Sequence, residues 1–125
     1  MVSMKLLRNM SRAMDKRLYV IVDKSLEPVY GSVQGGHCVA QWLLEHPDQT
    51  WNNEYLIYLY GDVKRWMKKL KDHDCSVFRE PDLGNQVTAI ATYNKGTIFR
   101  NLHTISTKYH GWKRAHGFRA DVESD

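Results

Sequence analysis

The chain has 125 residues, of which 42% are hydrophobic and 26% charged, and its formal net charge is +4. This length and balance predict one globular domain that needs no disulfide or metal to fold, and no stretch approaches the roughly 20 apolar residues of a membrane-spanning helix. The positive charge favours encounter with a polyanion, although the same charge also serves solubility.

Disulfide and metal sites find little support in the sequence. Cys38 and Cys75 form no C-x-x-C motif, so we expect two reduced thiols rather than a structural disulfide or a redox pair. The six histidines are scattered without H-x3-H spacing, and we therefore expect no metal and no other cofactor.

Residues 1–15 are basic, rich in methionine and nearly free of acidic residues. Leu7, Met10 and Met14 fall at helical spacing, which superficially resembles an organelle transit peptide. Because several of these methionines would serve as alternative starts, we interpret the segment as an N-terminal extension of a cytoplasmic domain over residues 16–105.

The clearest strand is predicted over residues 17–23, which contain an unbroken run of β-forming residues. A run without alternation is typical of a strand buried on both faces, in the middle of a sheet covered by helices. After a loop containing Pro28, apolar periodicity predicts a helix over residues 31–45. Pro47 ends it, because a residue before proline is pushed out of the α region.

A second strand is predicted over residues 54–60, and Asp62 is a good N-cap for a helix over residues 63–72. The apolar residues of this helix follow the i, i+3, i+4, i+7 rule, and they are Val63, Trp66, Met67 and Leu70. Its outer face is basic.

A third, short strand is predicted over residues 75–79, a loop over 80–85, a fourth strand over 86–92 and a short helix over 97–103. The basic tail over residues 106–125 shows no pattern. The order β-α-β-α-β-β-α predicts an α/β fold, a three-layer α/β/α arrangement with a four-stranded, mixed and mainly parallel sheet. The short link between the last two strands allows that pair to be antiparallel instead.

The first candidate site is the glycine pair of the predicted first helix. Gly35 and Gly36 would each cost about 1 kcal/mol relative to alanine, which a helix accepts where a neighbouring strand or a ligand approaches its backbone. Gln34 precedes the pair and His37 follows it. The alternative is that His37 is only a structural histidine.

The second candidate site is the loop after the third strand, which gathers Arg79, Glu80, Asp82 and Asn85. Open α/β sheets usually place ligands at such strand ends. The alternative is an ordinary turn, because proline, aspartate, glycine and asparagine are standard turn formers.

Over roughly residues 17–104, the chain resembles the type II peptidyl-tRNA hydrolase family. In that family a first strand leads into a helix bearing Gln-x-x-His-Ala, and Gln34 and His37 match it, with Cys38 in place of the alanine. The family has a lysine four residues before the glutamine, where this chain has Tyr30.

The segment from residue 79 to residue 91 is similar to the family's loop and last strand. There Asp82, or alternatively Glu80, matches the family's acidic site residue and Thr88 matches its threonine. Lys24 is the candidate to replace the absent lysine in substrate binding.

The resemblance implies an enzyme that hydrolyses the ester bond of peptidyl-tRNA and releases peptide and free tRNA. His37 would deprotonate the attacking water, and Asp82 would orient the water or the imidazole. Gln34, Asn85 and Thr88 would donate hydrogen bonds to the carbonyl oxygen or the ribose. No Ser/His/Asp or Cys/His set is evident, so direct attack by water is preferred over a covalent intermediate.

The expected partner is tRNA, with no membrane, and the chain is expected as a monomer or homodimer. The side chains expected to contact phosphates without reading sequence are Lys64, Arg65, Lys68, Lys69, Arg79, Lys113 and Arg114. In the tail, Tyr109, Trp112 and Phe118 would stack on the unpaired CCA bases, or the tail would merely pack one tryptophan on the domain.

Two other functions fit the same sequence. One is a non-catalytic RNA- or protein-binding module on the same fold. The other is a structural or regulatory protein in which His37 and Asp82 are only core and turn residues.

Overall fold

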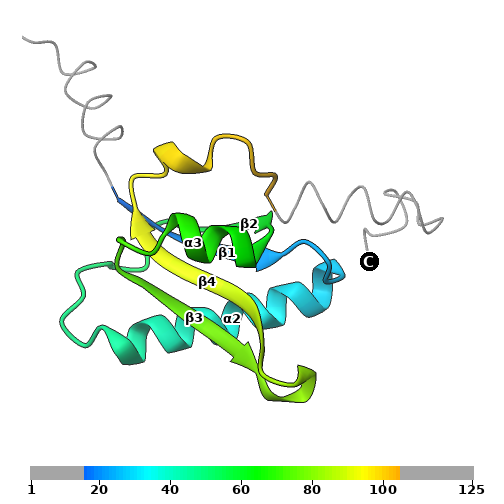
Figure 1. The fold of residues 1–125 in the computed structure, drawn as a ribbon. Helices are drawn as coiled ribbons and strands as arrows, with labels where there is room; N and C mark the ends of the chain where they lie inside the picture. Colours follow the sequence, from blue (N-terminus) through cyan, green and yellow to red (C-terminus); the bar gives the residue numbers. More distant parts are fainter. Residues whose placement is uncertain (1–15, 105–125) are drawn as a thin grey trace, which may run out of the picture.

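The computed structural model describes residues 16–104. Its one sheet contains β1 (Arg17–Asp23), β2 (Leu56–Gly61), β3 (Cys75–Glu80) and β4 (Gln86–Asn94), in the order β2-β1-β4-β3 (Figure 1). β1 pairs in parallel with β2 and antiparallel with β4, and β4 pairs antiparallel with β3. The mixed α/β fold is confirmed. β1, β2 and β3 share one direction, but β4 separates β1 from β3, so the pairing is mainly antiparallel rather than mainly parallel.

The helices α2 (Pro28–Glu45) and α3 (Val63–Lys69) lie on opposite sides of the sheet (Figure 1). Successive side chains of β1 alternate between these sides, which we call the α2 face and the α3 face. The core of the α2 face contains Leu18, Val20 and Val22 of β1 together with Cys38 and Trp42 of α2. The core of the α3 face contains Tyr19 and Ile21 of β1 together with Val63, Trp66 and Leu70. The central strand therefore contributes to two cores, which explains its unbroken apolar run.

α2 begins at Pro28, three residues earlier than the apolar periodicity indicates. Glu27 is its N-cap, and the Glu27 carboxylate accepts hydrogen bonds from the backbone N–H groups of Val29 and Tyr30. Proline is favourable in the first turn because its missing N–H would have no helical partner there. The predicted end of the helix, at Glu45, is confirmed.

The other elements match their predictions less closely at the ends. Asp62 caps α3 as expected, accepting from the backbone N–H groups of Lys64 and Arg65, but the helix ends at Lys69. The prediction of a helix over 97–103 is wrong, because only the 3-10 turn η2 (Thr97–Phe99) forms there. A single turn suffices to place Phe99 in the core of the α3 face.

Two glycines let α2 lie close to the sheet. A Cβ on Gly31 would stand 2.7 Å from the Tyr60 hydroxyl, and one on Gly35 would stand 2.7 Å from the ring of Tyr58. A neighbouring strand, β2, therefore explains Gly35. Gly36 is exposed, and a Cβ there would meet nothing nearer than the Tyr58 hydroxyl at 4.0 Å. Packing on the sheet does not explain Gly36.

The outer edge of β2 is paired with the segment that follows η2. The Tyr60 N–H donates to the His103 carbonyl at 2.9 Å, and Leu59 forms an antiparallel bridge with Thr104. Within residues 16–104, no helix is long and apolar enough to cross a membrane. The predicted N-terminal extension and basic tail lie outside the described residues.

Candidate functional site

Both candidate segments meet at one edge of the sheet. Since β1, β2 and β3 run in the same direction, their carboxyl ends lie at a common edge, which we call the carboxyl edge. α2 and α3 begin there, and the 3-10 turn η1 (Pro81–Leu83) follows β3 there. The glycine-bearing helix and the acidic turn therefore face each other.

Gln34 joins the two segments. Its side chain is 1% exposed, its Nε2 donates to the Glu80 carboxylate at 2.9 Å, and its Oε1 accepts from the Thr88 hydroxyl at 2.6 Å. A carboxylate only accepts hydrogen bonds, so the amide nitrogen must face Glu80 and the amide oxygen must face the hydroxyl. This buried network connects α2, β3 and β4.

A β-bulge in β4 directs the Thr88 side chain towards the side-chain amide of Gln34 on α2. Phe78 pairs with Ala89 and Arg79 pairs with Val87, which leaves Thr88 without a partner on β3. Val87 packs in the core of the α3 face and Ala89 in that of the α2 face. The extra residue changes the alternation at this point and directs the hydroxyl towards α2.

Glu80 is the carboxylate that contacts α2. Hydrogen bonds from Gln34 and from the backbone N–H of Asp82, with the nearby charge of His37, hold the pKa of Glu80 below its usual value. Glu80 is therefore ionised at neutral pH. Asp82 itself is exposed on η1, so of the two predicted acids Glu80 lies in the network and Asp82 beside it.

His37 and Tyr30 lie next to this network on α2. His37 is exposed, and its ring stacks on Phe78 with the centroids 4.8 Å apart and the planes at 7°. Burial and the negative charges of Glu80 and Asp82 raise the pKa of the Tyr30 hydroxyl, which stays protonated at neutral pH. The site thus offers an accessible imidazole and a phenolic donor beside an ionised carboxylate.

A cleft of about 590 Å³ opens at the same edge and contains Lys24, Lys64 and Arg79. We call it the cationic cleft. Asp23 and Asp62 also line this cleft, where Asp23 accepts from the Val63 N–H and Asp62 from the Lys64 N–H at the start of α3. Among residues 16–104, none of the three cations forms an ion pair, so their charges are available to an anion.

Lys68 and Asn85, two other predicted binding residues, do not line this cleft. Lys68 is exposed on α3, and Asn85 is exposed after η1, where its carbonyl accepts from Arg79 at 3.4 Å. Lys113 and Arg114 lie outside the described residues, as do the tail aromatics. Lys24, Lys64 and Arg79 are far apart in the sequence, and the topology brings them together at this cleft.

The two cysteines are free thiols in the structure. Burial raises the pKa of Cys38 to about 12, so this thiol is not a nucleophile at neutral pH. Within the described part of the chain, no group of three or more His, Cys, Asp or Glu side chains is placed to hold a metal ion.

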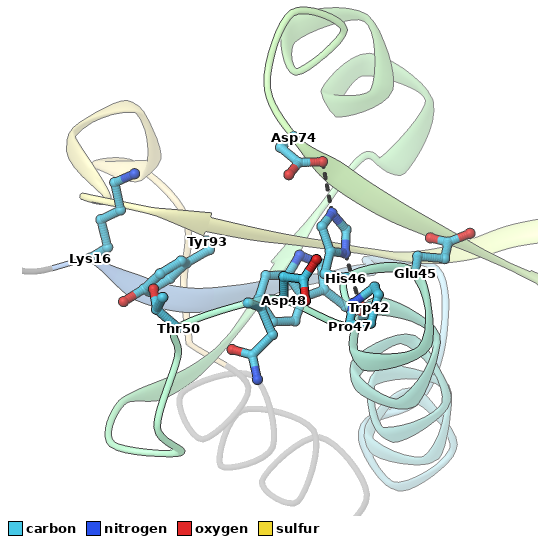
Figure 2. A pocket seen from close by; sticks show the side chains of 10 residues that line it. Lys16, Trp42, Glu45, His46, Pro47, Asp48, Thr50, Asp74 and Tyr93 are labelled. Atoms are coloured by element: carbon cyan, nitrogen blue, oxygen red, sulfur yellow. Dashed lines mark hydrogen bonds and ion pairs between the residues drawn. The ribbon is translucent and has the colours of Figure 1, made fainter.

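A second hollow, of about 470 Å³, lies at the opposite edge of the sheet (Figure 2). It is built around His46, which stacks on Trp42 and lies between the Trp42 carbonyl and Asp74. The Nδ1 atom is 2.8 Å from that carbonyl, and Nε2 is 2.7 Å from the Asp74 carboxylate. Because both ring nitrogens are engaged, this histidine stabilises the end of α2 rather than serving as a free base.

The His46–Asp74 pair predicts a pH-dependent stability. The hydrogen bond to Asp74 raises the pKa of His46, so protonation favours the folded state. This contribution is fully present below the unfolded-state pKa of about 6.5 and is lost as the pH rises through the higher folded-state pKa. The carboxylate is 82% exposed, so we expect at most about 1 kcal/mol.

Urea denaturation between pH 5.5 and 8.5 measures this effect. The free energy of unfolding should fall more steeply with rising pH in the natural protein than in His46→Gln. Parallel curves for the two proteins would show that the pair does not stabilise the fold.

No protein-family model, curated protein or solved structure matches the chain. A proposed function therefore rests on the chemistry of the carboxyl edge and on the resemblance of its residues to the site residues of type II peptidyl-tRNA hydrolases.

Proposed function

We propose that the protein hydrolyses the ester bond of peptidyl-tRNA. The observation that carries the proposal is the bonding of Gln34 to both Glu80 and Thr88. It joins the two segments that resemble the type II peptidyl-tRNA hydrolase family, although they are far apart in the sequence.

The reaction needs a base for the attacking water and a donor for the oxyanion. His37 is accessible and would take the proton of a water that attacks the ester carbonyl carbon. The protonated Tyr30 hydroxyl would donate to the oxyanion, which forms as the carbonyl π bond breaks. When the carbonyl re-forms, the ribose oxygen leaves and takes the proton back from His37.

Gln34 and Thr88 act in this scheme as positioning residues, because both are buried and bonded to other groups. They hold the Glu80 carboxylate in place beside His37. The negative charge of Glu80 then stabilises the imidazolium that forms when His37 accepts the proton.

The cationic cleft would hold the phosphates of the tRNA acceptor end. Arg79 and Glu80 are successive residues of β3, and Arg79 lines this cleft while Glu80 bonds α2. A nucleic acid strand held by Lys24, Lys64 and Arg79 would therefore pass the carboxyl edge next to the proposed reaction site. Such contacts position the substrate without reading its sequence.

The double variant Lys64→Ala/Arg79→Ala should bind a tRNA acceptor-stem hairpin more weakly and with less dependence on salt. The slope of log K against log salt is negative, and its magnitude should decrease by about 0.9 for each duplex phosphate that the variant no longer neutralises. Fluorescence anisotropy titrations between about 50 and 200 mM salt, a range over which such affinities change strongly, measure both the affinity and its salt dependence. Lys95→Ala removes an exposed lysine at the other end of β4 and should leave the slope unchanged. An equal slope in the double variant would exclude the cleft from binding.

A non-catalytic tRNA-binding role is the second candidate, favoured by Tyr30 at the position of the family's lysine. An N-acetylated aminoacyl-tRNA separates the two functions. Release of many equivalents of tRNA per protein molecule supports hydrolysis. Saturable binding of this probe without ester cleavage supports the binding role and refutes the enzyme.

A further inference from the structure

A second group of cations lies beside α3, away from the cationic cleft. Arg65 and Lys69 of α3 and Arg100, which follows η2, line a recess of about 430 Å³ that we call the α3–η2 pocket. Its other lining residues are Trp66, Thr97, Ile98, Asn101 and Leu102. None of these described residues is acidic, and among residues 16–104 none of the three cations forms an ion pair. Their positive charge is therefore uncompensated.

Packing in the core of the α3 face supports this pocket. Phe99 of η2 is buried, and the centroid of its ring lies 5.1 Å from that of Trp66, so that η2 is held against α3. The Lys69 ammonium lies over the Trp66 ring, 4.7 Å from its centroid. Arg100 directly follows Phe99. Core residues thus set the positions from which the cations extend.

The other hollows of this part of the molecule contain both signs of charge. A neighbouring hollow of about 400 Å³ contains Lys16 and Lys95 together with Asp72 and Asp74. The cationic cleft also contains two aspartates. The α3–η2 pocket is thus the better suited to an anion. Arginine and lysine side chains together favour a phosphate, which accepts several charge-assisted hydrogen bonds at once.

Lys68 connects this pocket with the cationic cleft. Lys64 lines the cleft and Arg65 lines the pocket. At about 100° per residue, Lys68 lies between these two around the axis of α3, so the three form a continuous basic surface across the outside of the helix. Lysine is depleted in protein–protein interfaces, and a surface of this composition therefore favours a nucleic acid over an acidic protein.

We propose that the α3–η2 pocket binds a phosphate of the paired acceptor stem of tRNA, while the cationic cleft holds a phosphate closer to the 3′ end. The inference rests on the proposed function for the identity of its ligand. It adds a second tRNA contact, which lies across α3 from Arg79 and explains the basic outer face of this helix.

The width of α3 places this contact in the stem rather than at the CCA end. An α-helix with its side chains is about 10–12 Å across, so phosphates on either side of α3 are about that far apart. Successive phosphates of one duplex strand advance by about 3.4 Å along the axis, which makes this separation about three nucleotides. The cleft lies next to the proposed reaction site, where the unpaired CCA end carries the ester. A phosphate in the α3–η2 pocket therefore belongs to the paired stem.

Arg65→Ala/Arg100→Ala tests the proposal, because both side chains are exposed and their loss leaves the core intact. This double variant should bind an acceptor-stem hairpin that ends in CCA about tenfold more weakly than the natural protein does, at about 100 mM salt. It should bind a CCA trinucleotide with unchanged affinity. Anisotropy titration of the hairpin and NMR titration of the trinucleotide measure the two affinities. Equal thermal unfolding temperatures show that the fold is retained.

Lys16→Ala/Lys95→Ala is the matched control, since it removes the same charge from the neighbouring hollow. It should leave the hairpin affinity nearly unchanged, because at about 0.1 M salt exposed charges more than about 10 Å apart are largely screened. Equal weakening by the two double variants would mean that only net charge matters, and would overturn the proposal. Weaker binding of the trinucleotide by Arg65→Ala/Arg100→Ala would overturn it too, because the pocket would then hold the CCA end.

Two further results separate this inference from the proposed function. Hairpin binding that Arg65→Ala/Arg100→Ala leaves unchanged overturns the stem contact alone, whereas a natural protein that binds no hairpin overturns the role of the cationic cleft as well. A polyglutamate that displaces the hairpin as well as an unlabelled hairpin of equal charge does would identify an acidic protein as the partner and overturn the stem contact. None of these measurements requires cleavage of the ester, so hydrolysis of N-acetylated aminoacyl-tRNA is judged separately.

Discussion

His37→Ala should lower kcat/KM for peptidyl-tRNA cleavage by about 10²- to 10⁴-fold, the usual contribution of a general base. Because the His37 side chain is exposed, its loss should change the free energy of unfolding little. Quantifying peptide release at substrate concentrations well below KM gives kcat/KM directly. Binding of the acceptor-stem hairpin should be nearly unchanged.

His73→Ala provides the control for this experiment. His73 is also an exposed histidine, but it precedes β3 and lies far from the carboxyl edge. Its replacement should leave turnover unchanged. Unchanged turnover in His37→Ala would remove this residue from the mechanism, even if the protein proved to be a hydrolase.

Gln34→Leu should lower the free energy of unfolding by about 1–3 kcal/mol, because it leaves buried polar groups without their partner. The Thr88 hydroxyl loses its acceptor, and the Glu80 carboxylate loses its side-chain donor. Urea denaturation at neutral pH measures the loss. Thr88→Val removes only the neutral partner and should cost about 1 kcal/mol.

The pH dependence of the same variant gives an independent test. Gln34 helps to depress the pKa of Glu80, so the stabilisation is present above the unfolded-state value and is lost as the pH falls through the folded-state pKa. Below neutrality, Gln34→Leu should therefore lose less stability on acidification than the natural protein does. Equal acid sensitivity would show that the amide does not hold Glu80 ionised.

Much of the fold follows from local patterns in the sequence. The unbroken apolar run of β1 indicates burial on both faces, and the spacing of Val63, Trp66 and Leu70 indicates the inner face of α3. Strand order does not follow from such patterns, because the position of β4 between β1 and β3 depends on long-range pairing. The early start of α2 does not follow either, because glutamate is not among the strongest N-cap residues.

The candidate site was predictable in its parts but not in its geometry. Gln34 and the acidic turn stand out in the sequence, yet the choice between Glu80 and Asp82 depends on where β3 ends. The signal that would have favoured Glu80 is its alternation with Phe78, which also packs towards α2. The bulge at Thr88 has no local signature, because it arises from a register shift against β3.

The close approach of Gly31 to Tyr60 and of Gly35 to Tyr58 restricts how α2 can rotate on the sheet, because a Cβ at either glycine would clash with β2. Turning the helix by one residue would drive a side chain into one of these rings. The orientation of Gln34 towards Glu80 thus depends on the lack of a Cβ at two glycines. It also depends on β2, a strand that contributes no residue to the proposed reaction. Substitutions of Tyr58 or Tyr60 on β2 are therefore expected to shift Gln34 and to weaken its hydrogen bonds to Glu80 and Thr88.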